Sequence, residues 1–249
     1  MKQLLLIGIG PGDPRQITFE AVDALRRADV FFVLDKGEAK DELVRLRKGI
    51  LERYRPEGGY RLVQVEDAKR DSQATNYVEA VHAWHQQRAA LYAHLLTDAL
   101  GAAEVGAFLL WGEPALYDST LRILDLVRAR GVAVPLEVIP GISSVQALAA
   151  RHQVPLNRIG EPLIVLPGRR LAEQGRVDNV VVMLDGQCAF AGLEDDGLWI
   201  YWGAYLGTAE EILVAGPLQQ VKGRILALRA AAQRRNGWIM DTYLLRREG

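Results

Sequence analysis

The first half of the chain alternates short apolar runs with helical patterns, and this alternation limits its possible folds more than any other feature. Apolar runs of strand length occupy residues 4–9, 30–34, 61–65, 105–112 and 135–141. Between them, residues 18–28, 41–54, 76–100 and 119–130 place apolar side chains three or four positions apart, as an amphipathic helix does. Strands that are apolar throughout and separated by helices indicate a parallel sheet covered on both faces.

The second half follows a different pattern. After a short helical segment at residues 143–151, five strand-like runs lie closer together, at residues 163–168, 180–184, 198–206, 212–218 and 237–245. Pro167, Gly203 and Gly216 interrupt these runs, which favours a second, mixed sheet. We therefore predict two α/β domains, an N-terminal domain at residues 1–139 and a C-terminal domain at residues 140–249.

Composition limits the partners and the location. The 249 residues include 30 basic and 31 acidic side chains, a formal net charge of -1, so the total charge predicts attraction neither to nucleic acid nor to an anionic membrane. No uncharged apolar run approaches the roughly 18 residues that a membrane helix needs. The single cysteine, Cys188, excludes an intrachain disulfide and fits a reducing compartment. We expect a cytosolic protein without a membrane or nucleic-acid partner.

The most distinctive local motif is the glycine-rich turn GIGPGDP that follows the first apolar run. A dinucleotide-binding fingerprint would require glycine at the position of Asp13, whose charge would also repel a pyrophosphate. The Walker pattern fails as well, because no Gly-Lys-Ser/Thr closes the loop. What remains is a tight turn at the carboxyl end of a parallel strand, where open α/β sheets bind their ligands.

Two further strands end in the same way. The run at residues 105–112 leads into Trp111-Gly112-Glu113-Pro114, and the run at residues 135–141 leads into Gly141-Ile142-Ser143-Ser144. Each turn combines glycine with a small polar or acidic residue. Three such turns at the carboxyl ends of strands in one sheet favour a cofactor site over three unrelated structural turns.

Five ordered segments resemble the tetrapyrrole methylases: GIGPGDP (8–14), WGEPALY (111–117), VIPGISSVQALAA (138–150), VVVML (180–184) and GTAEEILVAGPL (207–218). Within that family, the charged segment at residues 35–54, the segment around residues 76–93 and the ending WIMDTYLLRR are similar to members that convert precorrin-5 to precorrin-6A and release acetate. The resemblance implies a homodimeric, S-adenosylmethionine-dependent C-methyltransferase with its active site in the cleft between two α/β domains.

The resemblance also implies which residues bind the cofactor. They are Pro11 in the first turn; Trp111, Gly112, Glu113 and Leu116 in the second; Ser143 and Ser144 in the third; and Met183, Leu206, Gly207 and Thr208 in the C-terminal domain. Many family members have Asp where this chain has Glu113. The longer acid keeps the charge but changes its reach.

The tetrapyrrole substrate carries many carboxylates, which require local cations because the total charge is near zero. Candidate substrate contacts lie where strands end, at Gly12, Asp13, Arg15, Lys36, Arg169 and Arg170. For each cation, a solvated surface charge is the alternative. Asp13 is also the candidate proton-transfer residue for release of acetate, although Asp-Pro is equally typical of the entry to a helix.

Several other functions stay open. The chain could act on another corrin carbon, on a diphthamide precursor or on ribosomal RNA, or it could be a non-catalytic sensor that binds a nucleoside. His82 and His85 are three residues apart in a helical segment, but no third ligand lies near them in the sequence. We therefore predict no metal site.

Overall fold

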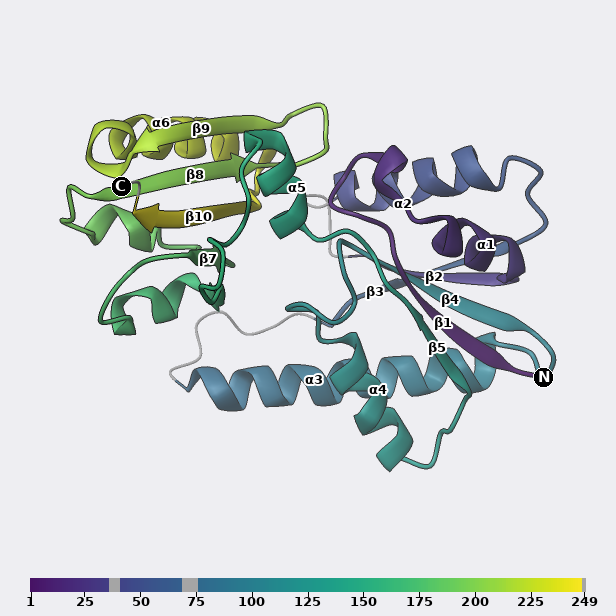
Figure 1. Cartoon of the computed structure of the whole chain (residues 1–249). Helices are drawn as coiled ribbons and strands as arrows, with labels where there is room; N and C mark the ends of the chain where they lie inside the picture. The colour runs from purple at the N-terminus through teal and green to yellow at the C-terminus, as the bar shows by residue number, and fades with distance from the viewer. Residues whose placement is uncertain (36–40, 69–75, 248–249) are drawn as a thin grey trace. The chain divides into compact units, whose positions relative to one another are not determined.

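The structure is a computed structural model that describes residues 1–35, 41–68 and 76–247. The chain divides into two compact units (Figure 1). Unit 1 comprises Met1–Gly10 and Pro14–Ile142, and unit 2 comprises Pro11–Asp13 and Ser143–Gly249. The tip of the first glycine-rich turn thus belongs to unit 2, although the residues on both sides of it belong to unit 1.

Unit 1 is built on a parallel sheet in the order β3-β2-β4-β1-β5. Its strands are β1 (Gln3–Gly8), β2 (Val30–Asp35), β3 (Arg61–Glu66), β4 (Val105–Leu110) and β5 (Leu136–Ile139). Ile7 of β1 pairs with Leu109 of β4 on one side and with Ile139 of β5 on the other. The predicted parallel sheet is confirmed, and every apolar run of the first half forms one of its strands.

Helices cover both faces of this sheet (Figure 1). On one face, α1 (Phe19–Arg27) and α2 (Asp41–Tyr54) pack on a core that includes Leu5 and Ile7. On the other, α3 (Tyr77–His94) and α4 (Thr120–Ala129) pack on a core that includes Leu4 and Leu6. Successive side chains of β1 enter opposite cores because side chains alternate along a strand. A strand buried on both faces must be apolar at every position, which explains its sequence.

Two helix termini in unit 1 show how the sequence sets local structure. Thr18 caps α1, and its side chain accepts a hydrogen bond from the Ala21 backbone N–H at 3.1 Å, as its position before the helix predicts. The predicted long helix at residues 76–100 ends instead at His94 and continues as a π-helical turn over Leu95–Ala99. This turn keeps both Leu95 and Leu96 in the core.

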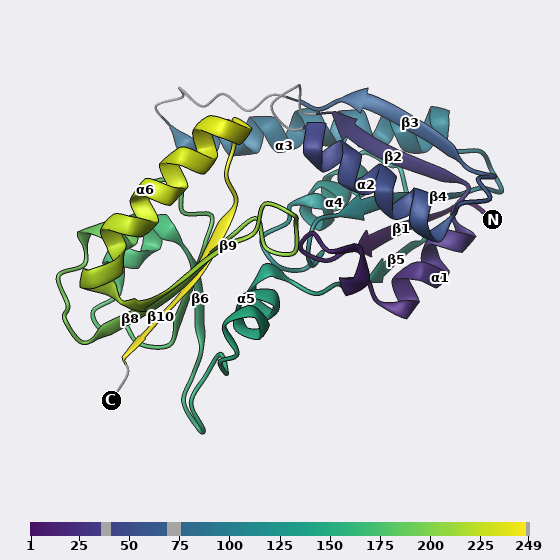
Figure 2. The same cartoon turned by 90° about the horizontal axis from the view of Figure 1, so that it is seen from above.

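Unit 2 contains the mixed sheet that the sequence predicted (Figure 2). Its strand order is β6-β7-β10-β8-β9. Its strands are β6 (Ile164–Pro167), β7 (Val180–Met183), β8 (Leu198–Ala204), β9 (Ile212–Pro217) and β10 (Asp241–Arg247). The pair β6–β7 is parallel and the other pairs are antiparallel.

Helices α5 (Ser144–His152) and α6 (Leu218–Asn236) pack on this sheet, and each forms a side-chain contact with one of two neighbouring residues of β10. From α5, the Ser144 hydroxyl lies 3.0 Å from the Thr242 hydroxyl. From α6, Arg229 Nε donates to the Asp241 carboxylate at 3.0 Å. Adjacent side chains of a strand point to opposite faces, so the two helices lie on opposite faces of the sheet. In the described part of the chain, no helix is long and apolar enough to cross a membrane.

Candidate cofactor and substrate site

Three glycines bring the strand-end turns of unit 1 into contact. Strand β1 ends at Gly8 and is flanked by β4 and β5, so the turns at Gly112 and Gly141 lie on either side of it. A Cβ atom at Gly8 would lie 2.7 Å from the Gly141 nitrogen, and one at Gly141 would collide with the Gly112 carbonyl oxygen. Gly112 N also donates to the Gly10 oxygen at 2.9 Å. A side chain at Gly8 or at Gly141 would force the turns apart.

Glu113 joins two of these turns through its carboxylate. Its Oε1 accepts a hydrogen bond from Ala115 N at 2.8 Å, within the second turn. Its Oε2 accepts from Gly141 N at 2.7 Å, in the third turn. An ionised carboxylate offers about four lone-pair sites, so two backbone donors leave acceptor capacity on both oxygens. The side chain therefore holds the turns in place and can still accept from a ligand.

Unit 2 contains a turn at Leu206–Thr208 that packs tightly against Gly12. A Cβ atom at Gly12 would lie 2.7 Å from both the Leu206 oxygen and Thr208 Cγ2. Gly207 has a φ of +79°, a backbone conformation that glycine adopts readily. Glu211 Oε2 accepts from Gly207 N at 2.7 Å. Residues Pro11–Asp13 and the segment Leu206–Thr208 therefore form one packed corner of unit 2.

The third turn leads into α5 through a capping box. Ser143 is buried, and its hydroxyl accepts from Val145 N at 3.1 Å and also contacts Gln146 Oε1. Gln146 Oε1 in turn accepts from Ser143 N at 3.1 Å. The hydroxyl is thus engaged at the start of the helix.

Comparison with known proteins identifies the family of this chain. The model of the Tetrapyrrole (Corrin/Porphyrin) Methylases matches residues 3–222. This chain belongs to the tetrapyrrole methylase family. A protein from Sinorhizobium sp named precorrin-6A synthase [deacetylating] is 48% identical over 99% of this chain and 96% of its own length.

Solved structures agree with this assignment. A putative cobalamin synthesis related protein (CobF) from Corynebacterium diphtheriae is 37% identical, with a TM-score of 0.86 over 99% of both chains. The uroporphyrin-III C-methyl transferase from Thermus thermophilus, solved in complex with S-adenyl homocysteine, shares only the fold. It is 19% identical, with a TM-score of 0.57 over 97% of this chain and 91% of its own.

The predicted cofactor residues of this methylase lie in both units. Trp111, Gly112, Glu113 and Leu116 belong to unit 1, in the turn after β4. The members in unit 2 are Pro11, Ser143, Ser144, Met183, Leu206, Gly207 and Thr208. The three glycine turns were predicted to lie together at one edge of the parallel sheet. In unit 1 they do so, with close contacts among Gly8, Gly112 and Gly141. Binding of a cofactor by these residues stays a prediction.

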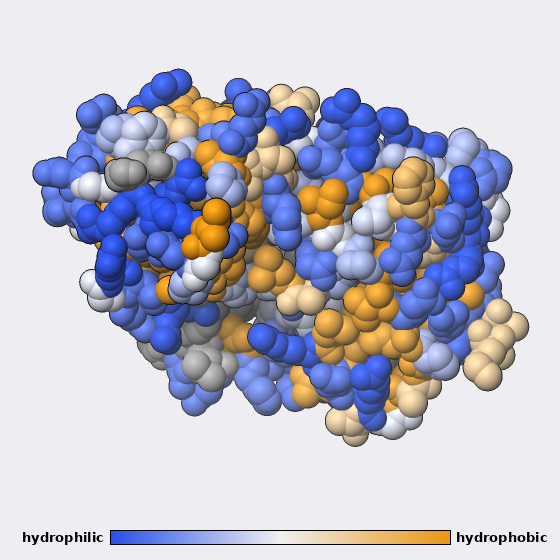
Figure 3. Space-filling view, viewed as in Figure 1, coloured by the Kyte–Doolittle hydropathy of each residue, from blue (hydrophilic) through white to orange (hydrophobic). Residues whose placement is uncertain are grey.

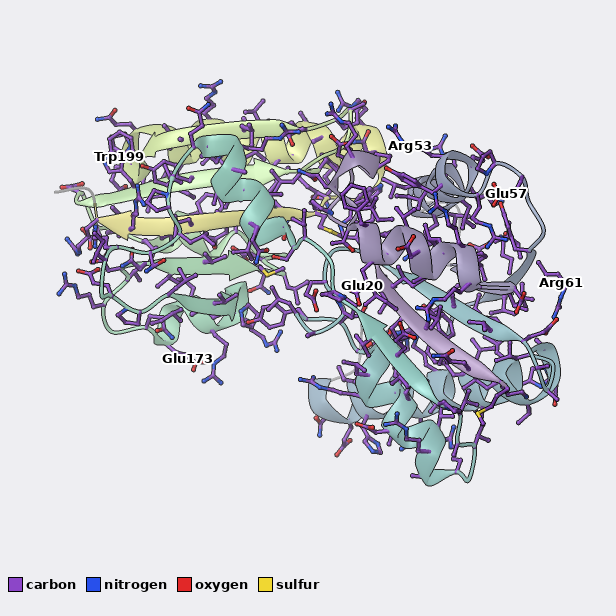
Figure 4. All side chains as sticks on the ribbon, turned by 45° about the vertical axis from the view of Figure 1, so that its right-hand side comes forward. Glu20, Arg53, Glu57, Arg61, Glu173 and Trp199 are labelled. Atoms are coloured by element: carbon purple, nitrogen blue, oxygen red, sulfur yellow. The ribbon has the colours of Figure 1, made fainter. Side chains whose placement is uncertain are left out.

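The candidate substrate residues differ in their surroundings. Asp13 is half-buried and precedes a short 3-10 turn at Pro14–Gln16, whereas the cap of α1 is Thr18. Arg15 and Arg169 are exposed. Arg170 forms an ion pair of 2.8 Å with Glu173, a surface residue that is labelled in Figure 4. Lys36 lies outside the described residues.

A buried acid two residues after Met183, Asp185, was not predicted from the sequence of the methylase. Asp185 follows β7 and accepts hydrogen bonds from Tyr243 Oη at 2.6 Å and from Ala189 N at 2.7 Å. Burial and the neighbouring Asp185 carboxylate raise the pKa of Tyr243, so this phenol stays protonated and donates. A Cβ atom at Gly168 would collide with Asp185. Asp185 thus joins the turn after β7 to Tyr243 of β10 and packs closely against Gly168 at the end of β6.

Two signals could have revealed such supporting acids. Asp185 lies two residues after the apolar strand β7, and Glu113 lies three residues after β4. Glu211 lies inside the segment GTAEEILVAGPL that carries the family resemblance, and besides Gly207 N it accepts from Arg151 Nε at 3.0 Å. An acid in the turn that follows an apolar strand is a candidate acceptor for the backbone N–H groups of that turn.

Proposed function

We propose that this tetrapyrrole methylase is an S-adenosylmethionine-dependent C-methyltransferase that converts precorrin-5 to precorrin-6A and releases acetate. The observation that carries this proposal is the 48% identity, over nearly the whole of both chains, to the protein named precorrin-6A synthase [deacetylating]. The likeness to the CobF structure extends the same relationship to the fold. The turns that Glu113 and Glu211 hold in place carry residues suited to binding a cofactor.

The side chains at the predicted cofactor positions fit S-adenosylmethionine. The cofactor carries an ammonium group and ribose hydroxyls, which require acceptors, and Glu113 offers carboxylate capacity beyond its two backbone contacts. Its adenine and methylene groups suit apolar side chains, which Leu116, Met183 and Leu206 provide. We assign the cofactor to these residues together with Pro11, Trp111, Gly112, Ser143, Ser144, Gly207 and Thr208.

The chain needs no nucleophile of its own for methylation. Bound S-adenosylmethionine supplies an electrophilic methyl group on a sulfonium centre, and a ring carbon of the substrate attacks it. Such a displacement is accelerated chiefly by orientation of the two reactants. The protein therefore contributes rigid turns, which Glu113, Glu211 and Asp185 fix through hydrogen bonds to backbone N–H groups.

Release of acetate requires proton transfer. Water adds to the acetyl carbonyl, the bond between the acetyl carbon and the ring breaks, and the macrocycle takes up the electron pair. A base near the acetyl group accelerates the attack by water. We assign this role to Asp13. We also propose that Gly12, Arg15, Arg169, Arg170 and Lys36 contact the substrate, with the four cations pairing with its carboxylates.

The homodimer and the cytosolic location rest on the family resemblance and on composition. One feature of unit 1 is compatible with a partner copy. Strand β5 lies at an edge of the sheet and exposes Val138. An apolar area covers the region of β5 and α4 on the face in Figure 3.

A panel of substrates tests the proposed activity. The protein is incubated with methyl-labelled S-adenosylmethionine and, separately, with precorrin-5, an earlier precorrin, a diphthamide precursor protein and ribosomal RNA. We expect label only in precorrin-5, because the chain is nearly half identical to the deacetylating enzyme. Label in a different acceptor would replace the proposed substrate within the family. Calorimetric binding of the cofactor without consumption on any acceptor would instead indicate a sensor.

A further inference from the structure

Tyr117 combines a strained backbone with an exposed aromatic ring. Six described residues other than glycine have a positive φ: Tyr117, Gln153, Asn179, Leu184, Cys188 and Tyr205. At Tyr117 the φ is +55°, which is a genuine outlier for a bulky side chain. Residues in such conformations persist only where their surroundings hold them, and they cluster at ligand sites.

Burial does not account for this conformation. Tyr205 has a similar φ of +50°, but its side chain is 1% exposed and it packs edge-on against Trp238 at 5.0 Å. Its packing can offset the strain. Tyr117 is 42% exposed, so its ring gains much less from burial in the protein.

Hydrogen bonds fix the loop on both sides of Tyr117. Before it, Glu113 Oε1 accepts from Ala115 N at 2.8 Å, and Leu116 N donates to the Glu113 backbone oxygen at 3.3 Å. After it, Asp118 Oδ1 accepts from Thr120 N at 2.7 Å. The left-handed residue therefore lies between two anchored segments.

A buried ion pair supports the second anchor. Arg88 and Asp67 are both buried and join through Nε and Oδ1 at 2.8 Å. Arg88 Nη1 also donates to Ser119 Oγ at 3.2 Å, and its Nη2 donates to Tyr92 Oη at 3.1 Å. Buried charges that satisfy one another in this way fix their neighbours, because breaking the pair leaves a charge without compensation.

We infer that Tyr117 is a substrate-binding residue whose ring packs against the tetrapyrrole macrocycle. This inference rests on the proposed function. The residue follows β4 at the carboxyl edge of the parallel sheet, where open α/β sheets bind ligands. A macrocycle offers a broad, largely apolar face with carboxylates at its rim. An aromatic ring can cover that face, and the phenol can donate to a carboxylate.

Three variants at this position test the inference through equilibrium binding of precorrin-5. Binding is measured in the presence of S-adenosylhomocysteine, which has no methyl group to transfer. Tyr117→Ala should weaken precorrin-5 binding about tenfold, the loss expected for one aromatic contact. Tyr117→Phe should retain most of the affinity, since it keeps the ring. Tyr117→Gly should bind precorrin-5 as weakly as Tyr117→Ala does. It should melt at a higher temperature than Tyr117→Ala, because glycine tolerates the positive φ.

Controls separate this inference from the proposed function. Leu62→Ala removes a side chain of similar exposure, 41%, from β3 of the same unit and should leave both affinities unchanged. All variants should bind S-adenosylhomocysteine as the wild type does. Unchanged precorrin-5 affinity in Tyr117→Ala would overturn the inference, as would a parallel loss of S-adenosylhomocysteine affinity or a wild type that does not bind precorrin-5. A wild type that binds precorrin-5 without methylating it would refute the proposed function alone.

Discussion

At the scale of single residues, the acid in the second turn has a structural task that constrains its chemistry. Glu113 accepts two backbone N–H groups, from Ala115 and from Gly141. A carboxylate one methylene shorter could not span both donors without movement of the turns. The longer side chain of this chain therefore fits the separation between its own turns.

Substitution of Glu113 measures both of its proposed tasks. Glu113→Gln leaves only one acceptor oxygen, so one backbone N–H loses its partner, at a cost of about 1–3 kcal/mol in the free energy of unfolding. If Glu113 also binds the cofactor, S-adenosylhomocysteine affinity should fall about tenfold, equivalent to loss of one hydrogen bond to a charged group. Calorimetry and urea unfolding provide the two values.

The matched control is Glu20→Gln, a change at an exposed acid of α1 (Figure 4). It should alter neither value. Reduced stability of Glu113→Gln with unchanged cofactor affinity would restrict Glu113 to holding the turns together.

Residue-level prediction from sequence found the turns but not all of their supports. Gly8, Gly112 and Gly141 were recognisable because strand-end glycines have a local sequence pattern. The place of Asp185 after an apolar strand marks it as a candidate acceptor, but its partner Tyr243 is distant in the sequence, and the strained backbone of Tyr117 has no sequence signal. Ser143 was predicted as a cofactor residue, and the structure gives its hydroxyl a structural role as well, in a capping box with Gln146.

At the scale of elements, apolar periodicity predicted the strands and most helices, with differences of a few residues at their ends. It did not predict α6 (Leu218–Asn236), whose buried residues are Leu218, Ile225, Arg229 and Ala232. A buried arginine interrupts the apolar stripe of this helix. Arg229 is tolerated there because it pairs with Asp241 and donates to the Asp185 backbone oxygen. Burial of a charge through tertiary pairing has no local sequence signal.

A pH-dependent contact links α1 to the edge of its sheet. Arg27 donates to both carboxylate oxygens of Glu137 in β5, at 2.6 and 3.0 Å. These hydrogen bonds lower the pKa of Glu137 below its usual value. The stabilisation is therefore complete above the unfolded-state pKa of about 4.3 and is lost as the pH falls through the lowered folded-state pKa.

Glu137→Gln should reveal this contact. The pair lies at the surface and is partly exposed. The variant should therefore lose at most about 1 kcal/mol at pH 7, and the difference from the wild type should shrink below about pH 4. Urea unfolding of both proteins at pH 7 and pH 3.5 measures this difference in the free energy of unfolding. Arg27→Gln should show the same trend, and the double variant should lose no more than either single one. A difference that does not change with pH would contradict the role of the charge.

At the scale of the whole molecule, the change in sequence pattern at mid-chain corresponds to a change of sheet type. Strands buried on both faces form the parallel sheet of unit 1, and the glycine- and proline-interrupted strands form the mixed sheet of unit 2. Local patterns could not show that Pro11–Asp13 belong with unit 2. That assignment depends on the packing of Gly12 against Leu206 and Thr208. The activity, in turn, was predictable only through the family resemblance, since no catalytic triad or metal motif marks the site.

The stoichiometry of a single turnover tests the central claim most directly. Excess protein is mixed with precorrin-5 and one equivalent of methyl-labelled S-adenosylmethionine, and the macrocycle and free acetate are quantified by mass spectrometry. The proposed function predicts one labelled methyl group in the macrocycle and one acetate released for each precorrin-5 consumed. A labelled macrocycle that retains its acetyl group would contradict the deacetylating activity, and an unlabelled macrocycle would contradict methylation of precorrin-5 itself.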